Sequence, residues 1–346
     1  MRQEEARPGH RPGDEVGHYP LTMRAVQIAA LGGPEVLRPA RLPLPDPGAG
    51  EVLIRNAYVG VNFADVKSRR GGHHIARSLP FLPGLDVAGT IASLGDGVEG
   101  LHVGQRVAAA TDGGAYAEYA RARAVLTWAL PDPDVDLREV AGIVAMMTAY
   151  NVLIKKAALQ TGESVLVHAA AGGVGTLLLQ LAKIHGAGRV VAVVGSDAKV
   201  AVAERYGADE VIVSRGEGYG GQLDAVLPDG ADVVMDAVGG GMFAAAFERL
   251  APYGRIVNFG NAAGDPAPID PAAMHKKNLT LVGYSSGTYR KSRPEGVRLA
   301  GTRMLELHAE GALRVPVGHV YRLEEAAEAH RAIESRSSTG KLILEI

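Results

Sequence analysis

The sequence feature that most constrains the fold is a glycine-rich turn between an apolar strand and an apolar helix. Residues 165–167 predict a short buried strand, and Gly172, Gly173 and Gly175 follow it closely. Apolar side chains then recur at helical spacing, at Leu177, Leu178, Leu181 and Ile184. Without Cβ atoms such a turn lets a helix pack closely on a strand, and its N–H groups and the helix dipole face an anion. The turn therefore predicts a dinucleotide-binding fold. The residues expected at the pyrophosphate are Ala171, Gly172, Gly173 and Val174.

The residues after the next two strands indicate which dinucleotide is bound. NAD enzymes usually end the second strand with a carboxylate for the ribose 2′-hydroxyl, about 20 residues after the glycines. Here this corner holds small residues, hydroxyl groups and cations, namely Gly195, Ser196, Lys199, Ser214 and Arg215. These groups suit a 2′-phosphate, which a carboxylate would repel. NADPH is therefore preferred over NADH, although Asp197 could instead point toward the ribose.

Composition excludes several other classes of protein. The formal net charge of the 346 residues is −2, so no general attraction to nucleic acid or to an anionic membrane is expected. The absence of cysteine excludes disulfides, thiolate metal sites and cysteine nucleophiles. No segment has the length of a membrane span, which favours a soluble, cytoplasmic protein. Residues 1–22 are rich in proline, glycine and charge, and are expected to form a disordered extension.

Two kinds of strand pattern divide the rest of the chain. Short β-type runs predict a compact, partly barrel-like domain, at 24–28, 51–58, 88–94, 106–110 and 116–120. A proline-rich loop is expected at 39–50. Six apolar strands separated by helical stretches then predict a doubly wound parallel sheet, at 164–168, 189–194, 210–213, 233–236, 255–259 and 280–284. We expect an α/β fold with a dinucleotide-binding domain at 145–284 and a second domain formed by 23–144 and 285–346.

Six separated motifs carry a resemblance to a known family. They lie at 60–65, 83–89, 104–107, 114–119, 254–260 and the glycine-rich turn. Together they resemble the medium-chain dehydrogenase/reductase superfamily, from about residue 23 to the end of the chain. Within it they are similar to the zinc-free quinone oxidoreductase branch, which is related to ζ-crystallin and to enoyl reductase modules. The resemblance implies a Rossmann domain that binds NADPH and a GroES-like β domain.

The resemblance also implies that no catalytic metal is bound. By this resemblance, Asn62 and Leu85 stand where zinc-dependent relatives carry cysteine and histidine, and leucine cannot ligate zinc. The adjacent pair His73 and His74 is more typical of a solvated loop than of a metal site.

Roles at the cofactor follow from the same resemblance. The residues that match positions lining the nicotinamide end are Asn62, Phe259, Gly260 and Asn261. Thr148 matches a hydroxyl at the start of the cofactor domain, and Val238 and Gly239 follow the fourth strand at its carboxyl end, where ligands collect in such sheets. Lys199 and Arg336 match a lysine and an arginine that reach the 2′-phosphate. Ser214 stands where reductases often have a tyrosine for that phosphate, and His73 stands where they have a tyrosine near the substrate. The catalytic candidates are Asn62, His73 as a proton donor, and Lys199, which matches a lysine proposed as the acid in enoyl reductases.

The activity implied is direct hydride transfer from NADPH to a small-molecule quinone or α,β-unsaturated carbonyl, without a metal. One alternative is reduction of an enoyl thioester, and another is an NADPH-binding structural or regulatory protein with little turnover. The branch is commonly dimeric, and an edge strand at 280–284 could join two copies. Residues 283–287 also fit the G-x-S-x-G pattern of hydrolases, but the polar residues 288–294 argue against the apolar helix that pattern needs. Ser285 is instead expected in the substrate cleft, which the loops at 71–82 and 285–294 should border.

Overall fold

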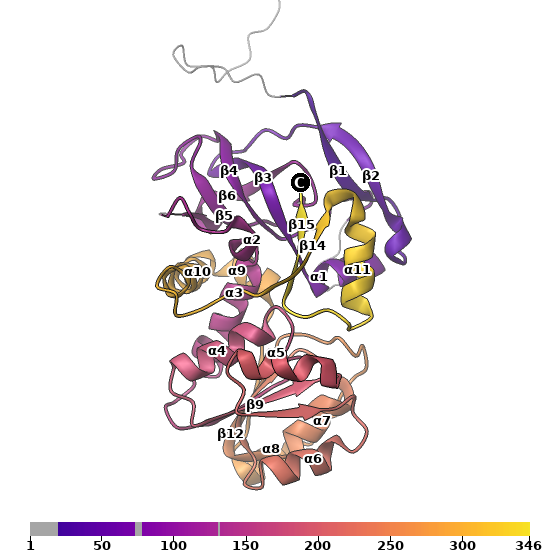
Figure 1. Ribbon diagram of the computed structural model, residues 1–346, viewed down its shortest axis with the longest axis vertical. Helices are drawn as coiled ribbons and strands as arrows, with labels where there is room; N and C mark the ends of the chain where they lie inside the picture. The colour runs from indigo at the N-terminus through magenta and orange to yellow at the C-terminus, as the bar shows by residue number, and fades with distance from the viewer. Residues whose placement is uncertain (1–19, 73–77, 131) are drawn as a thin grey trace, which may run out of the picture.

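The computed structural model describes residues 20–72, 78–130 and 132–346. Two sheets stack along the long axis of the molecule, with helix α3 (Ile143–Tyr150) between them (Figure 1). In this described part, no helix is both long and apolar enough to cross a membrane.

The lower half in Figure 1 contains a parallel sheet of six strands. Their spatial order is β10 (Glu210–Val213), β9 (Arg189–Val194), β8 (Ser164–Val167), β11 (Ala231–Asp236), β12 (Leu250–Asn258) and β13 (Thr280–Gly283). In sequence order this is the 3-2-1-4-5-6 arrangement of a doubly wound sheet, which reverses between β8 and β11. The predicted α/β fold is therefore confirmed, and its ligands are expected at the carboxyl ends of these two strands.

Helices cover both faces of the parallel sheet. One face packs against α3, α4 (Gly175–Ile184) and α5 (Val200–Arg205), and the other against α6 (Tyr219–Val226), α7 (Gly240–Glu248) and α8 (Pro271–Lys277). Side chains of β8 alternate accordingly, since Val165 and Val167 face α4 while Leu166 faces α6 and α7. Ile184 was expected on the apolar face of this helix, but it is the last residue of α4 and is 40% exposed.

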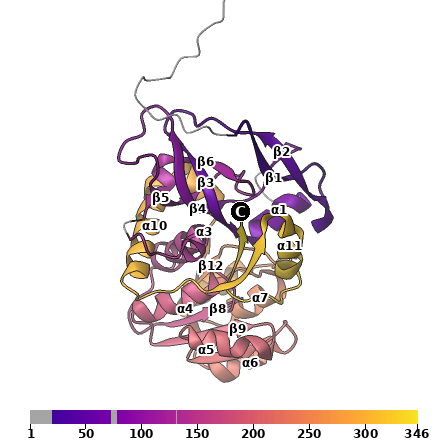
Figure 2. The same cartoon turned by 45° about the horizontal axis from the view of Figure 1, so that its top comes forward.

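The upper half contains a second, mostly antiparallel sheet. Its strand order is β14 (Val317–Arg322), β15 (Lys341–Glu345), β3 (Glu51–Val61), β4 (Asp86–Leu94), β5 (Arg106–Ala110) and β7 (Thr127–Ala129), and β6 (Tyr119–Arg123) also pairs with β3. The last strand of the chain, β15, lies antiparallel to β3. Figure 2 shows the C-terminus among these early strands, beside α1 (Phe63–Arg70) and α11 (Ala326–Glu334).

Three local expectations were wrong. The predicted loop at 39–50 contains the end of β2 (Leu37–Pro43), which pairs only with β1 (Thr22–Ile28) among the described strands, so its prolines occupy an edge strand that tolerates them. The strand expected at 116–120 begins instead at Tyr119. The loop expected at 285–294 contains helix α9 (Ser286–Ser292), because Ser285 caps it by accepting from the Thr288 amide at 3.2 Å.

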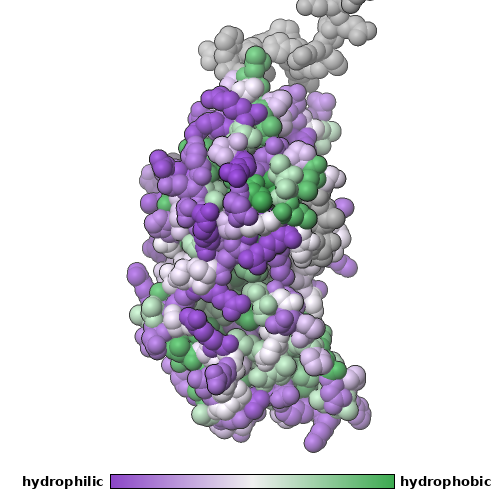
Figure 3. Space-filling model, turned by 90° about the vertical axis from the view of Figure 1, so that its right-hand side faces the viewer, coloured by the Kyte–Doolittle hydropathy of each residue, from purple (hydrophilic) through white to green (hydrophobic). Residues whose placement is uncertain are grey.

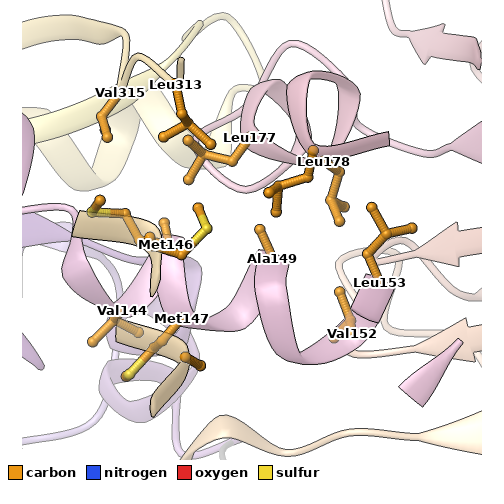
Figure 4. Close-up of a cluster of buried hydrophobic side chains, with 14 of the residues drawn as sticks. Val144, Met146, Met147, Ala149, Val152, Leu153, Leu177, Leu178, Leu313 and Val315 are labelled. Carbon is orange, nitrogen blue, oxygen red and sulfur yellow. The ribbon is translucent and has the colours of Figure 1, made fainter. Parts of the chain in front are cut away.

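Helix α3 joins the two halves through a continuous apolar core. In Figure 4, Met146 and Ala149 of α3 face Leu177 and Leu178 of α4, and Leu313 closes the cluster. The remaining helical elements are η1 (Pro34–Val36), η2 (Ala124–Leu126), α2 (Leu137–Val140), the π-helical η3 (Asn151–Lys156), η4 (Asp197–Lys199), α10 (Pro294–Ala309) and η5 (Leu323–Glu325). This shared core holds the carboxyl ends of the parallel strands beside the upper sheet.

Candidate active site

The glycine-rich turn follows β8 and leads into α4. A Cβ on Gly175 would lie 2.4 Å from the Ala169 carbonyl oxygen, so only glycine allows the helix to approach the strand this closely. The amides of Gly173 and Val174 donate to no acceptor among the described residues. Helix α4 begins directly after them, so these two N–H groups and the positive end of the helix dipole form a site for an anion.

Residues 336–341, which we call the C-terminal connector, run along this turn. The Gly340 amide donates to the Ala171 carbonyl at 2.8 Å. At one end of the connector, Lys199 Nζ donates to the carbonyls of Arg336 and Ser338 at 2.7 and 2.8 Å. At its other end is Lys341, which contacts the upper sheet. The connector therefore links the 2′-phosphate corner, the turn and the upper sheet in one continuous segment.

The corner around Lys199 is open and basic. A Cβ on Gly195 would meet no atom within 4 Å, and Arg215 Nε donates to the Gly195 carbonyl at 2.9 Å. Burial, followed by the charge of Arg215, lowers the pKa of Lys199. Asp197 is exposed.

The other residues predicted at this corner have local partners. Ser196 is partly buried and Ser214 buried, with Ser214 Oγ accepting from the Gly216 amide at 3.1 Å. Arg336 Nη2 donates to the Ala262 carbonyl at 3.4 Å, so this arginine spans toward the loop after β12.

The turns after β11 and β12 approach each other closely. Gly239 has φ +77°, and a Cβ there would lie 2.6 Å from Asn261 Oδ1. A Cβ on Gly260 would lie 2.7 Å from the Ala237 carbonyl oxygen. The Phe259 amide donates to the Asp236 carbonyl at 2.9 Å. The structure thus brings the predicted residues after both strands together at the point where the sheet order reverses.

Below these turns lies a buried hydrogen-bond network that the sequence analysis did not identify. His168 Nδ1 lies 2.7 Å from Asp236 Oδ1, and His168 Nε2 lies 2.7 Å from the Tyr219 hydroxyl. Asp236 also accepts from the amides of Val238 and Gly239, each at 3.2 Å, and from Asn258 Nδ2 at 2.6 Å. Burial would raise the pKa of Asp236, but these hydrogen bonds, led by that of His168, hold it below the ordinary value. The network fixes the turn that carries Val238 and Gly239.

Asn62 lies in the upper half, as the N-cap of α1. Its Nδ2 donates to Asp86 Oδ1 at 2.8 Å, and its Oδ1 accepts from Lys341 Nζ at 2.7 Å. Asp86 and Lys341 are 0% and 2% exposed and form an ion pair at 3.3 Å. The orientation of the Asn62 amide is therefore set on both sides by buried charges.

Asp86 and Lys341 were missed as site residues. Each is the first residue of a strand whose next residues are apolar, and this was the available signal, because charges at such positions are buried only when they are paired. Their partnership was not predictable, because 255 positions separate them in the sequence.

Asp65, on the first turn of α1, is a second buried acid beside Asn62. Its carboxylate accepts from the amides of Asn62 and Gly84 at 2.9 and 3.0 Å. Burial nevertheless raises its pKa to about 6, with a smaller contribution from Asp86. Thr148 is buried on α3, whose Val144 amide donates to Asp86 at 3.2 Å.

The predicted proton donor His73 lies outside the described residues. Within the described ranges, no three histidine, aspartate or glutamate side chains gather as a metal site would require. Figure 3 shows a recess midway along the molecule, between the two halves. The residues predicted to contact the cofactor thus come from both halves, and the C-terminal connector passes between them.

A dinucleotide-binding fold and a β domain that both contribute residues to one site are typical of a class of two-domain oxidoreductases. Protein-family models described as "Alcohol dehydrogenase GroES-like domain" and "Zinc-binding dehydrogenase" match residues 48–132 and 173–301. A probable quinone oxidoreductase of Schizosaccharomyces pombe is 33% identical over 325 residues, covering 92% of this chain and 96% of the relative. The chain belongs to the quinone oxidoreductase branch of the medium-chain dehydrogenase/reductase superfamily, so the predicted family is confirmed.

Solved structures agree with this assignment. A mycobacterial protein complexed with NADPH superimposes with a TM-score of 0.87 at 34% identity, covering 94% of this chain and all of that one. The quinone oxidoreductase of Escherichia coli complexed with NADPH superimposes with a TM-score of 0.86 at 30% identity, covering 93% of this chain and all of that one.

Proposed function

We propose that this chain transfers hydride directly from NADPH to a quinone or to an α,β-unsaturated carbonyl compound. At the coarser level it is an NADPH-dependent oxidoreductase of its family, and the predicted cofactor and enzyme class are confirmed. The observation that carries the proposal is the C-terminal connector, which places Lys199, the unpaired amides of the turn, and Asn62 in order along one segment.

The residues of the lower half fit NADPH. The free amides of Gly173 and Val174 would bind the pyrophosphate. Glycine suits position 173 because a Cβ there would lie only 3.3 Å from the Lys341 side chain. Lys199 uses two of its three N–H donors on carbonyls and keeps one for the 2′-phosphate, which Arg215 and Arg336 would flank. When bound, NADPH supplies the hydride from C4 of its nicotinamide.

The upper half would position the nicotinamide and the acceptor. Asn62 presents an amide whose orientation Asp86, Lys341 and the Gly60 carbonyl fix, so it would give the nicotinamide end of the cofactor a rigid polar boundary. The glycines after β11 and β12 allow these two turns to pack on each other, which would hold the residues predicted to contact the nicotinamide in place. Proton delivery by His73 or Lys199 stays a prediction.

The acceptor class can be tested by following NADPH consumption with a panel of neutral quinones, enones and a crotonyl thioester. We expect turnover with quinones or enones, and slower turnover with NADH. Preference for the thioester would instead favour the enoyl reductase alternative. Tight NADPH binding without turnover of any acceptor would contradict the proposal and favour a structural or regulatory role.

We also propose that two copies associate through β13, the edge strand of the parallel sheet. Leu281 on this strand is 36% exposed, and its neighbour Thr280 is exposed as well. Light scattering should give twice the mass of one chain, and Leu281→Lys should lower it by placing a charge on the shared edge. A wild-type mass equal to one chain would contradict this assembly.

A further inference from the structure

Helix α9 carries a buried arginine that the proposed chemistry does not use. Arg290 is 3% exposed, and its backbone carbonyl accepts from Arg123 Nη2 at 2.9 Å. The helix begins three residues after β13 ends, at the carboxyl edge of the parallel sheet where ligands of this fold collect. Arg290 thus lies where α9 meets the upper sheet, on the substrate side of the molecule.

Two of the three guanidinium nitrogens of Arg290 are buried without a hydrogen-bond acceptor among the described residues. Its Nε and Nη1 are buried without a partner among the described residues, and so are the nearby Ser286 Oγ and Asn151 Oδ1. The Tyr284 hydroxyl, which accepts from Asn151 Nδ2 at 3.4 Å, lies beside them, and burial raises its pKa to about 12. Buried arginines are almost always paired, because an unpaired buried charge is strongly unfavourable. A cation with these polar neighbours indicates a site that a ligand completes.

The carboxylates that act on Arg290 have other partners, and the first of them, the exposed Asp112, pairs with Arg123 at 3.4 Å. Burial lowers the pKa of Arg290, and the charges of Asp112, Asp86 and Asp65 oppose that shift, in this order. Asp86 is paired with Lys341 and Asn62, and Asp65 accepts from two backbone amides. The two acids that contact Asn62 therefore act on Arg290 electrostatically, yet neither acid is its hydrogen-bond partner.

We propose that Arg290 binds a carboxylate carried by the conjugated acceptor, so that the substrate is an anionic enone or quinone. The inference rests on the proposed function and specifies its substrate class. The planar guanidinium donates to carboxylate oxygens with defined geometry, and Ser286 and Tyr284 offer hydroxyl groups beside it. Three nearby carboxylates weaken the positive potential, which favours a singly charged carboxylate over a doubly charged phosphate.

The test compares trans-4-oxopent-2-enoic acid with its methyl ester, two enones that differ in charge. In the wild type, kcat/KM should be about tenfold or more higher for the acid, as expected for a buried charge-assisted contact. Arg290→Gln should abolish this preference by lowering kcat/KM for the acid alone, and Arg290→Lys should retain part of it. Arg293→Gln, at an exposed arginine three residues later, should leave both values unchanged.

Two results would overturn the inference. Equal kcat/KM values for acid and ester in the wild type would do so without any variant, and so would an equal loss for both compounds in Arg290→Gln. If neither compound nor any neutral quinone is reduced, the proposed function fails separately. Calorimetric titration of the acid into the NADP⁺ complex then decides, since binding that Arg290→Gln removes supports the carboxylate site and absence of binding overturns it.

Discussion

Two buried arginines in this molecule have opposite surroundings. Arg69 on α1 is 0% exposed, and its guanidinium donates to the Gly32 carbonyl at 3.1 Å, to His330 Nδ1 at 3.4 Å and to the Glu334 carboxylate. Arg290 on α9 is nearly as buried, and its Nε and Nη1 donate to no described residue. Burial alone therefore does not show whether a charged side chain stabilises the fold or binds a ligand. Its hydrogen-bond partners distinguish the two roles.

The partners of Arg69 connect α1 to the C-terminal helix α11. Because arginine can only donate, Nδ1 of His330 accepts, and its Nε2 is left to donate to the Tyr116 hydroxyl at 3.1 Å. Glu334 also pairs with Arg70 at 2.5 Å. This closed network holds the C-terminal residues against the upper sheet, whereas the open surroundings of Arg290 leave its charge for a ligand.

The largest effect is expected from replacing each arginine with methionine. Arg69→Met should lower the free energy of unfolding by about 3–5 kcal/mol, because it leaves Glu334 and His330 without their buried partner. Arg290→Met should leave stability unchanged or raise it, because it removes an unpaired charge. Urea unfolding of both variants measures the difference, and an equal loss in the two would break the comparison.

A second effect concerns pH at the Arg69 network. Burial, followed by the charge of Arg69, lowers the pKa of His330 to about 3. Between the ordinary pKa of 6.5 and that value, the unfolded state binds a proton that the folded state does not. This residue should therefore cost stability as the pH falls, by roughly 2 kcal/mol from pH 6.5 to 4.5.

The difference between wild type and His330→Asn isolates this contribution. Asp65, whose pKa burial raises to about 6, acts with the opposite sign in the same range, since its folded form keeps a proton that the unfolded form loses. Denaturant unfolding at both pH values should show a smaller loss for the variant than for the wild type. Parallel losses would mean that His330 is protonated in the folded protein.

The smallest effect is expected at Lys199. Its surroundings are intermediate between those of Arg69 and Arg290, because it donates to two carbonyls but has no counter-ion among the described residues. Lys199→Ala should weaken NADPH binding about tenfold, or roughly 1.4 kcal/mol, and leave NADH binding nearly unchanged. The exposed Lys276 supplies the control, since Lys276→Ala should bind both cofactors as the wild type does. Equal losses for both cofactors in Lys199→Ala would remove this residue from the 2′-phosphate site.

The cofactor half could be predicted because its signals are local. The glycine-rich turn, its strand and its helix lie within about 20 consecutive residues, and backbone sterics dictate their geometry. The substrate side depends on pairings that no local pattern encodes. Asp86 meets Lys341 only because β15 returns beside β3, and Arg290 becomes buried only because residues predicted as a loop form α9.

The most direct test of the account uses NADPH with deuterium in both positions at C4 of the nicotinamide and an enone that the wild-type protein reduces. Direct transfer predicts one deuterium on carbon in the product, detected by mass spectrometry, together with a primary isotope effect on kcat/KM. Complete oxidation of the labelled NADPH with an unlabelled product would show that the hydride does not pass directly to the acceptor, and would contradict the proposed mechanism.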